Sequence, residues 1–309
     1  MTDLSGIHPL SVADTVSAGQ LNHRLALGVQ FIDALSQLPA SPPLVCDLEA
    51  IGTHPCPLRF AAHGQARQAL RHAGRIARLL EHAAGHGGST VFRLRAYGQR
   101  KPGPSGYVGD NDPRLYVPRR LALTPVLGAL GVPPATRDNI RDAWLWPGAA
   151  YPLPANATAL RGQIRRGPSL ALAREVPWAR LVVTRPRPVI PPAPPPPPDF
   201  DLEARLAWGH GDDRGEFLVL LGGAVAPGGA AMPAALTLRL WVFLPPAGTT
   251  LDAADPLASL PLEEGGGDAL NDVLRGRAIP PGYVRQTAID LSVRPGGILS
   301  IPETALLYG

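Results

Sequence analysis

The sequence has little lysine and few aromatic residues, and both shortages argue against nucleic-acid binding. Lys101 is the only lysine, and arginine supplies every other basic residue behind the formal net charge of +4. The arginines are interleaved with acidic residues instead of gathered in a block. Aromatic residues make up 6% of the chain, too few for a base-stacking platform. We therefore predict no nucleic-acid partner.

Long apolar runs are absent as well. No stretch approaches the roughly 20 apolar residues that a membrane-spanning helix needs. Residues 1–20 lack the charged and apolar regions of a secretion signal and are predicted to form a tail. We therefore expect no membrane span, and synthesis in a bacterial cytoplasm. The expected location is a cytoplasmic assembly, with release in an extracellular particle left open.

Cysteine is scarce, which limits disulfide and metal chemistry. Cys46 and Cys56 are the only two cysteines, ten positions apart. Whether they pair stays open, but two thiols do not make a disulfide scaffold. His82 and His86 have helical i, i+4 spacing, yet no third ligand is indicated. We predict no metal and no cofactor.

Proline and glycine, in contrast, are abundant, with 37 and 34 of the 309 residues. That content suits a β protein with many turns. Apolar segments with strand character recur at 25–31, 42–51, 89–98, 116–127, 176–185, 204–208, 216–221, 236–246 and 283–302. We predict a mainly β fold of two β-sandwich units, immunoglobulin-like or transthyretin-like, with a short helical connector and a polyproline loop.

Three segments have helical features. Residues 64–88 carry apolar positions at helical spacing, but we favour two short strands because the neighbouring segments are strands. Residues 133–148 are the best candidate for a short helix, with Thr136 as its N-cap and Pro147 as its end. A helical turn is predicted at 268–274.

The composition divides the chain into four parts. The tail is followed by a β-rich domain at 21–125, a proline-rich connector with the short helix at 126–158, and a β-sandwich domain at 159–309. Residues 186–198 hold the polyproline run, which is stiff and has no internal hydrogen bonds. It is either a loop within the second sandwich or a linker.

Residues 207–217, AWGHGDDRGEF, concentrate side chains that can carry chemistry. Asp212 or Asp213 can accept hydrogen bonds from the amides of a turn. Three glycines supply a positive φ at little cost: Gly209, Gly211 and Gly215. We therefore interpret the segment as a hairpin turn between two strands.

The alternative for this segment is an ion or acid–base site formed by His210, Asp212, Asp213 and Glu216. Calcium needs several oxygens from a folded loop, and one turn supplies few of them. No nucleophile elbow, P-loop or dinucleotide fingerprint occurs in the sequence. We therefore predict no catalytic residue.

The run from Asp212 to Phe217 resembles the Asp-x-x-Gly-x-Phe turn of the carboxypeptidase regulatory-like, transthyretin-like β-sandwich family. In that family a strand leads into this turn and an apolar strand follows. The resemblance covers about 160–245 and implies a non-catalytic fold, adaptor or decoration. The polyproline run departs from the family, which has a short connection there.

Five tryptophans complete the candidate residues. Trp178, Trp208 and Trp241 are expected to fill a sandwich core. Packing is also the favoured interpretation of Trp144 and Trp146, in AWLWPG, but this pair would form a docking patch if it were exposed.

These features together predict a non-enzymatic structural or adaptor subunit of a bacterial macromolecular assembly. The specific hypothesis is a phage-tail-like contractile injection particle, with other protein subunits as partners and an oligomeric assembly as the result. One alternative is a carbohydrate-binding or adhesive β-sandwich module that uses Trp144 and Trp146 as a flat platform. A second is a hydrolase with a non-local site around His210 or His63.

Overall fold

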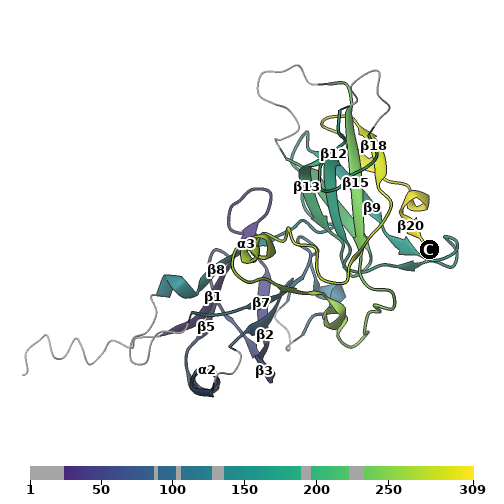
Figure 1. The fold of residues 1–309 in the computed structure, drawn as a ribbon. Helices are drawn as coiled ribbons and strands as arrows, with labels where there is room; N and C mark the ends of the chain where they lie inside the picture. The colour runs from purple at the N-terminus through teal and green to yellow at the C-terminus, as the bar shows by residue number, and fades with distance from the viewer. Residues whose placement is uncertain (1–23, 87–89, 102–105, 127–135, 189–195, 223–232) are drawn as a thin grey trace, which may run out of the picture.

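The computed structural model describes residues 24–86, 90–101, 106–126, 136–188, 196–222 and 233–309. Strands in five sheets dominate these residues, so the prediction of a mainly β protein is confirmed. The sheets form two layered units, one at the lower left and one at the upper right of Figure 1. Whether either unit is immunoglobulin-like or transthyretin-like stays a prediction.

The N-terminal unit packs two sheets around one core. The first sheet has the order β4 (Ala61–His63), β5 (Arg67–Arg71), β1 (Leu25–Asp33), β8 (Ile140–Leu145). The second has the order β16 (Leu262–Glu264), β7 (Arg119–Leu123), β6 (Phe92–Gly98), β2 (Leu44–Ile51), β3 (His54–Arg59). Buried side chains of both sheets, such as Phe31 and Leu94, share one apolar cluster. Cys46 and Cys56 lie in this core as free thiols.

The C-terminal unit repeats this construction with different strands. One sheet has the order β13 (Ala204–His210), β12 (Arg180–Arg185), β15 (Leu236–Leu244), β17 (Val284–Arg285), and β18 (Ile289–Val293) also pairs with β15. The facing sheet has the order β14 (Glu216–Leu221), β9 (Thr158–Gln163), β19 (Ile298–Ser300). A small third sheet joins β11 (Arg174–Glu175), β10 (Arg165–Arg166) and β20 (Leu307–Tyr308).

The sequence of strand β15 is almost continuously apolar because both of its faces are buried. Successive side chains of a strand point to opposite faces of the sheet. Leu238 and Leu240 point into the core of the C-terminal unit, whereas Trp241 and Phe243 belong to a second cluster that includes Trp146 of the N-terminal unit. Both faces of this strand are therefore covered.

Two expectations about local structure were wrong. Residues 74–86 form the helix α2 (Gly74–His86) instead of a strand, because Ile76 and Leu80 recur at helical spacing and bury one side of the helix in the N-terminal core. Among the described residues of the predicted helix at 133–148, which begin at Thr136, only η2 (Thr136–Asn139) is helical, as a single 3₁₀ turn. Residues 140–145 form strand β8 because parallel pairing with β1 buries alternate side chains.

The expected domain boundaries also differ from the way the strands are divided between the two units. The connector at 126–158 supplies β8 to the N-terminal unit. Strand β16, from the expected C-terminal domain, pairs in parallel with β7 of the N-terminal unit. The predicted helical turn near 268 is present as α3 (Ala269–Leu274), which lies beside β8 in Figure 1. The predicted tail at 1–20 lies outside the described residues.

The polyproline segment connects two neighbouring strands of one sheet. Arg185 of β12 pairs with Ala204 of β13, and the Arg187 side chain donates a hydrogen bond to the Pro197 carbonyl oxygen at 3.0 Å. Because its two ends meet, the segment is a loop within the C-terminal unit and not a linker between units. Residues 189–195 lie outside the described part of the chain.

Candidate functional site

The acidic turn crosses between two sheets. Strand β13 pairs with β12, whereas β14 pairs with β9 in the facing sheet. A single bridge joins Gly211 to Phe217. The predicted tight turn is present, since the Gly215 N–H donates to the Asp212 carbonyl oxygen, but β13 and β14 are not partners in one sheet as the predicted hairpin would make them.

Asp212 holds this crossing turn together. Its Oδ1 atom accepts hydrogen bonds from the backbone N–H groups of Arg214 and Glu216, both at 2.9 Å. Its Oδ2 atom is buried and accepts no hydrogen bond from a described residue. Burial, and next the neighbouring Asp213 carboxylate, raise the pKa of Asp212 to about 7. The carboxylate therefore serves the backbone of its own turn.

Of the three glycines, only Gly215 has a positive φ, at +72°. A Cβ atom on Gly215 would stand 2.6 Å from the Ile164 carbonyl oxygen. Gly209 is needed for a different reason, since its Cβ would lie 2.5 Å from a methyl carbon of Val219. A positive φ at Gly209 and Gly211, as the sequence suggested, is therefore wrong.

His210 points away from the acidic residues of this turn. It is completely buried, and its Nε2 atom lies 2.9 Å from the Gly276 carbonyl oxygen. Since that carbonyl can only accept, Nε2 carries the proton, and Nδ1 is left buried without a described partner. Burial, and next the charges of Arg180 and Arg119, hold the pKa of His210 well below its ordinary value. The ring is therefore neutral at physiological pH.

The charges near His210 belong to a buried network of three side chains. Glu263 of β16 accepts hydrogen bonds from Arg119 of β7 at 3.1 and 2.8 Å. It also accepts one from Arg180 of β12 at 3.2 Å. The side chains of Arg119 and Arg180 are completely buried, and that of Glu263 is 1% exposed. One carboxylate thus joins a guanidinium of each unit.

Backbone carbonyl groups complete this network. Arg119 donates to the carbonyl oxygens of Trp144, Val273 and Leu274, the last two at the end of α3. Arg180 donates to the carbonyl oxygen of Trp178. We call the contact zone between the units the seam; its members are Arg119, Trp146, Trp178, Arg180, His210, Glu263 and Gly276.

The predicted docking patch of Trp144 and Trp146 does not form. Trp146 is only 4% exposed, packs near His210 and donates a hydrogen bond to the Arg275 carbonyl oxygen at 2.9 Å. Trp144 is half-buried beneath the guanidinium groups of Arg275 and Arg277. The other three tryptophans are buried, as a packing role requires: Trp178, Trp208 and Trp241.

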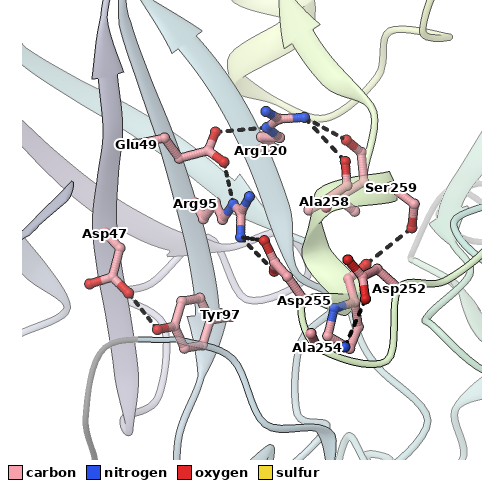
Figure 2. Close-up of polar contacts among 12 residues, drawn as sticks. Asp47, Glu49, Arg95, Tyr97, Arg120, Asp252, Ala254, Asp255, Ala258 and Ser259 are labelled. Atoms are coloured by element: carbon pink, nitrogen blue, oxygen red, sulfur yellow. Dashed lines mark hydrogen bonds and ion pairs between the residues drawn. The ribbon is translucent and has the colours of Figure 1, made fainter. Parts of the chain in front are cut away.

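A second ionic network lies on the outer face of the N-terminal unit (Figure 2). Glu49 of β2 stands between Arg95 of β6 and Arg120 of β7, and accepts a hydrogen bond from each. Arg95 also holds both oxygens of Asp255 at 2.7 Å. Asp255 directly precedes η4 (Pro256–Ser259), so these pairs fasten a returning segment of the chain to the sheet.

Tyr107 lies close to two further carboxyl groups, those of Asp112 and Asp213. Asp112 follows η1 (Gly109–Asn111), and burial raises its pKa to about 6. Tyr107 donates a hydrogen bond to Asp213 of the C-terminal unit at 3.3 Å. Among the described residues, no group of three or more histidine, cysteine, aspartate or glutamate side chains is arranged to hold a metal ion.

The non-local hydrolase site also lacks its required neighbours. His63 lines a cleft with Arg24, Arg67 and Arg71, and the described lining contains no carboxylate. His210 faces Trp146 and a carbonyl oxygen instead of an acid. No helix in the described part of the chain is long and apolar enough to cross a membrane.

Sequence reasoning missed the buried network. Its members come from three strands far apart in the chain, and no local motif joins them. One signal was available: Arg119 and Arg180 each stand next to strongly apolar strand residues, in PRRLAL and WARLVV. An arginine in such a position is either at an edge or buried with a partner.

Comparisons with known proteins do not assign a family. No family model matches the chain, and no curated protein matches it. Among solved structures, the Bacillus anthracis TIE protein has a TM-score of 0.21 and 8% identity, and the match covers 90% of this chain and 33% of that one. The minor pilin GBS52 of Streptococcus agalactiae has a TM-score of 0.21 and 7% identity, with 89% and 92% covered. The chain thus spans about a third of the first neighbour, and similarities this low carry no argument.

Proposed function

We propose that this protein is a non-enzymatic structural subunit that holds partner proteins at a fixed separation within a bacterial assembly. The observation that carries the proposal is the buried Arg119–Glu263–Arg180 network, which links the two sandwich units across the seam. Removing one partner of a buried ion pair typically costs about 3–5 kcal/mol. A hinge at this seam would have to break such pairs, so the two units move as one body.

Apolar contacts support the same interpretation. Domains of one chain move relative to each other by default, unless the interface between them is large and apolar. Here one buried cluster joins Trp146 to Trp208 and Trp241, and another joins Tyr97 and Tyr107 to Trp178. Buried aromatic side chains of both units therefore surround the charged network.

The polar groups of the candidate site serve the fold. Asp212 caps its own turn, Glu263 pairs with two arginines, and Glu49 pairs with two more. Strands β13 and β19 lie at the ends of their sheets, where a strand of a partner could add by β-augmentation. These features support a role in protein–protein contact instead of substrate turnover.

The specific assembly we propose is a phage-tail-like contractile injection particle, and the resemblance to the carboxypeptidase regulatory-like family stays part of this proposal. The test is fractionation of the native source by density gradient, followed by mass spectrometry of each fraction. We expect the chain to sediment with sheathed particles and to cross-link to other subunits.

A matched pair of variants strengthens that experiment. Glu263→Gln leaves two buried arginines without a negatively charged partner, whereas Asp201→Asn removes only an exposed carboxylate 3.8 Å from Arg205. We expect incorporation into particles to fall with the first and to stay unchanged with the second. Recovery of the native chain only as a free monomer would refute the proposal. The flat platform of Trp144 and Trp146 that the adhesive alternative required does not form, because Trp146 is buried.

A further inference from the structure

A cleft of about 590 Å³ opens on the C-terminal unit, and its lining includes no member of the seam. Its floor and walls come from β10, β11, the crossing turn and the segment after β15. Three arginines line it: Arg166, Arg174 and Arg214. The remaining lining residues that matter here are Glu175, Val176, Pro177, Asp213, Thr249, Thr250 and Leu251.

The pairing of β10 with β11 gathers two of these arginines on one face. Arg166 is directly opposite Arg174, and Arg165 is directly opposite Glu175. Since successive side chains alternate between faces, Arg165 and Glu175 form an ion pair at 3.4 Å on one side. Arg166 and Arg174 form a like-charge pair on the other. Like charges in directly opposed positions destabilise a sheet.

Neither arginine of this pair forms an ion pair with a carboxylate among the described residues. The Nε atom of Arg166 is buried and has no hydrogen-bond partner among the described residues. Two acids also line the cleft: Glu175 pairs with Arg165, and Asp213 accepts a hydrogen bond from the neutral Tyr107 hydroxyl, so three arginines and two carboxylates share the lining. Arg214 has only a long contact of 3.8 Å to Asp110, whose side chain is 97% exposed.

From this geometry we propose that the cleft binds a phosphoryl or sulfate oxyanion carried on a small organic body. A guanidinium fork matches the oxygens of such groups and can donate two parallel hydrogen bonds. Arg166 and Arg174 hold the anion between them, and Arg214 closes the open side. The hydroxyl groups of Thr249 and Thr250 add donors at the rim.

The other wall of the cleft accommodates the organic body. Val176, Pro177 and Leu251 line it with apolar atoms. Ligand sites typically combine such an apolar lining with a few convergent polar groups. An ester with an apolar group therefore binds more tightly than the inorganic anion.

Isothermal titration calorimetry on the full chain tests this inference. The probes are inorganic phosphate, inorganic sulfate, phenyl phosphate and phenyl sulfate, with sodium chloride at matched ionic strength as the blank. We expect inorganic anions to bind with a Kd on the order of 1 mM, since they have few atoms to contact. We expect the phenyl esters to bind at least several-fold more tightly. The preferred ester identifies the natural ligand as a phosphate or a sulfate ester.

Variants of the facing arginines supply the decisive comparison. Arg166→Gln and Arg174→Gln should each weaken binding at least about tenfold, the loss expected for one charge-assisted hydrogen bond. Arg78→Gln, at an exposed position of α2, should leave binding unchanged. Matching circular dichroism and thermal unfolding verify that each variant is folded.

Absence of binding by all four anions, or equal binding by wild type and both cleft variants, would overturn the inference. This result is separate from the proposed structural role. Particle incorporation can fail while the cleft still binds anions, and the reverse also holds. Arg166 and Arg174 are not part of the seam, so their variants should incorporate normally.

Discussion

Replacing Glu263 with glutamine should destabilise the protein by about 3–5 kcal/mol, the range for removing one partner of a buried ion pair. The Glu263 carboxylate accepts three hydrogen bonds from two guanidinium groups that are completely buried. Glutamine keeps the volume and one acceptor oxygen. It loses the negative charge, so Arg119 and Arg180 are left as unbalanced charges in a medium that solvates them poorly.

Urea unfolding followed by tryptophan fluorescence measures this loss directly. Trp146 and Trp178 lie at the seam and report on its opening. A loss of 3–5 kcal/mol corresponds to a fall in melting temperature on the order of 10 °C for a chain of this size. The exposed control Asp201→Asn should change the free energy of unfolding by less than about 0.5 kcal/mol.

A triple variant separates charge from packing. Changing Arg119 and Arg180 to methionine and Glu263 to leucine removes all three charges at similar volume. Apolar replacement of a whole buried ionic group is often neutral or stabilising, so the triple variant should recover most of the lost stability. The reasoning is refuted if Glu263→Gln unfolds within about 0.5 kcal/mol of wild type, or if the triple variant is as unstable as the single one.

Three further variants probe the crossing turn and the seam. Asp212→Asn keeps the turn's acceptor oxygen but removes a buried charge. The pKa of Asp212 is about 7 in the folded protein, above the ordinary value of 3.8. The free energy of unfolding of the wild type should therefore rise as the pH falls from about 7 to about 4. The variant should lack that gain. The measurement is the free energy of unfolding of both proteins at pH 8 and at pH 5, and an equal change in wild type and variant would contradict the prediction. Gly215→Ala should lower the free energy of unfolding by about 1–3 kcal/mol, because φ is positive there and a backbone oxygen blocks the Cβ position. Gly64→Ala, with open space around its Cβ, should be near neutral; thermal unfolding compares the two variants. Trp146→Ala should lower the free energy of unfolding by about 3–5 kcal/mol. Trp144→Ala should lower it clearly less, since only Trp146 is fully packed. Equal losses would refute the placement of Trp146 in the core of the seam.

The strands of this fold were accessible from the sequence, but their pairing was not. Alternating and continuous apolar runs located β12, β14 and β15, because burial on one or both faces leaves a local pattern. The crossing at Asp212 looked like a hairpin because glycine and aspartate favour tight turns in either arrangement. Which sheet receives β14 depends on its register with β9, more than 50 residues earlier.

The candidate site was less accessible for the same reason. The sequence predicted that Asp212 or Asp213 accepts hydrogen bonds from the amides of the turn, and Asp212 does so; this was accessible because the partners are neighbours in the chain. The network of Arg119, Arg180 and Glu263 joins three distant segments, and no spacing rule connects them. For Trp146 the sequence left a docking patch open beside a packing role, because its cover, the Arg275–Gly276 segment, comes from the far end of the sequence.

The return of the chain at β16 and α3 has a consequence for synthesis on the ribosome. The N-terminal sandwich cannot acquire its last strand, or the Val273 side chain in its core, until residues 262–274 have emerged. Most strands of the C-terminal sandwich emerge earlier, so the N-terminal unit begins to fold first but is completed only after the second unit has begun to form. During that interval one edge of β7 is unpaired, and the Arg119 guanidinium lacks Glu263 and the α3 carbonyl oxygens, although the Trp144 carbonyl oxygen is already available. A fragment that ends at residue 158 would remain in that unfinished state.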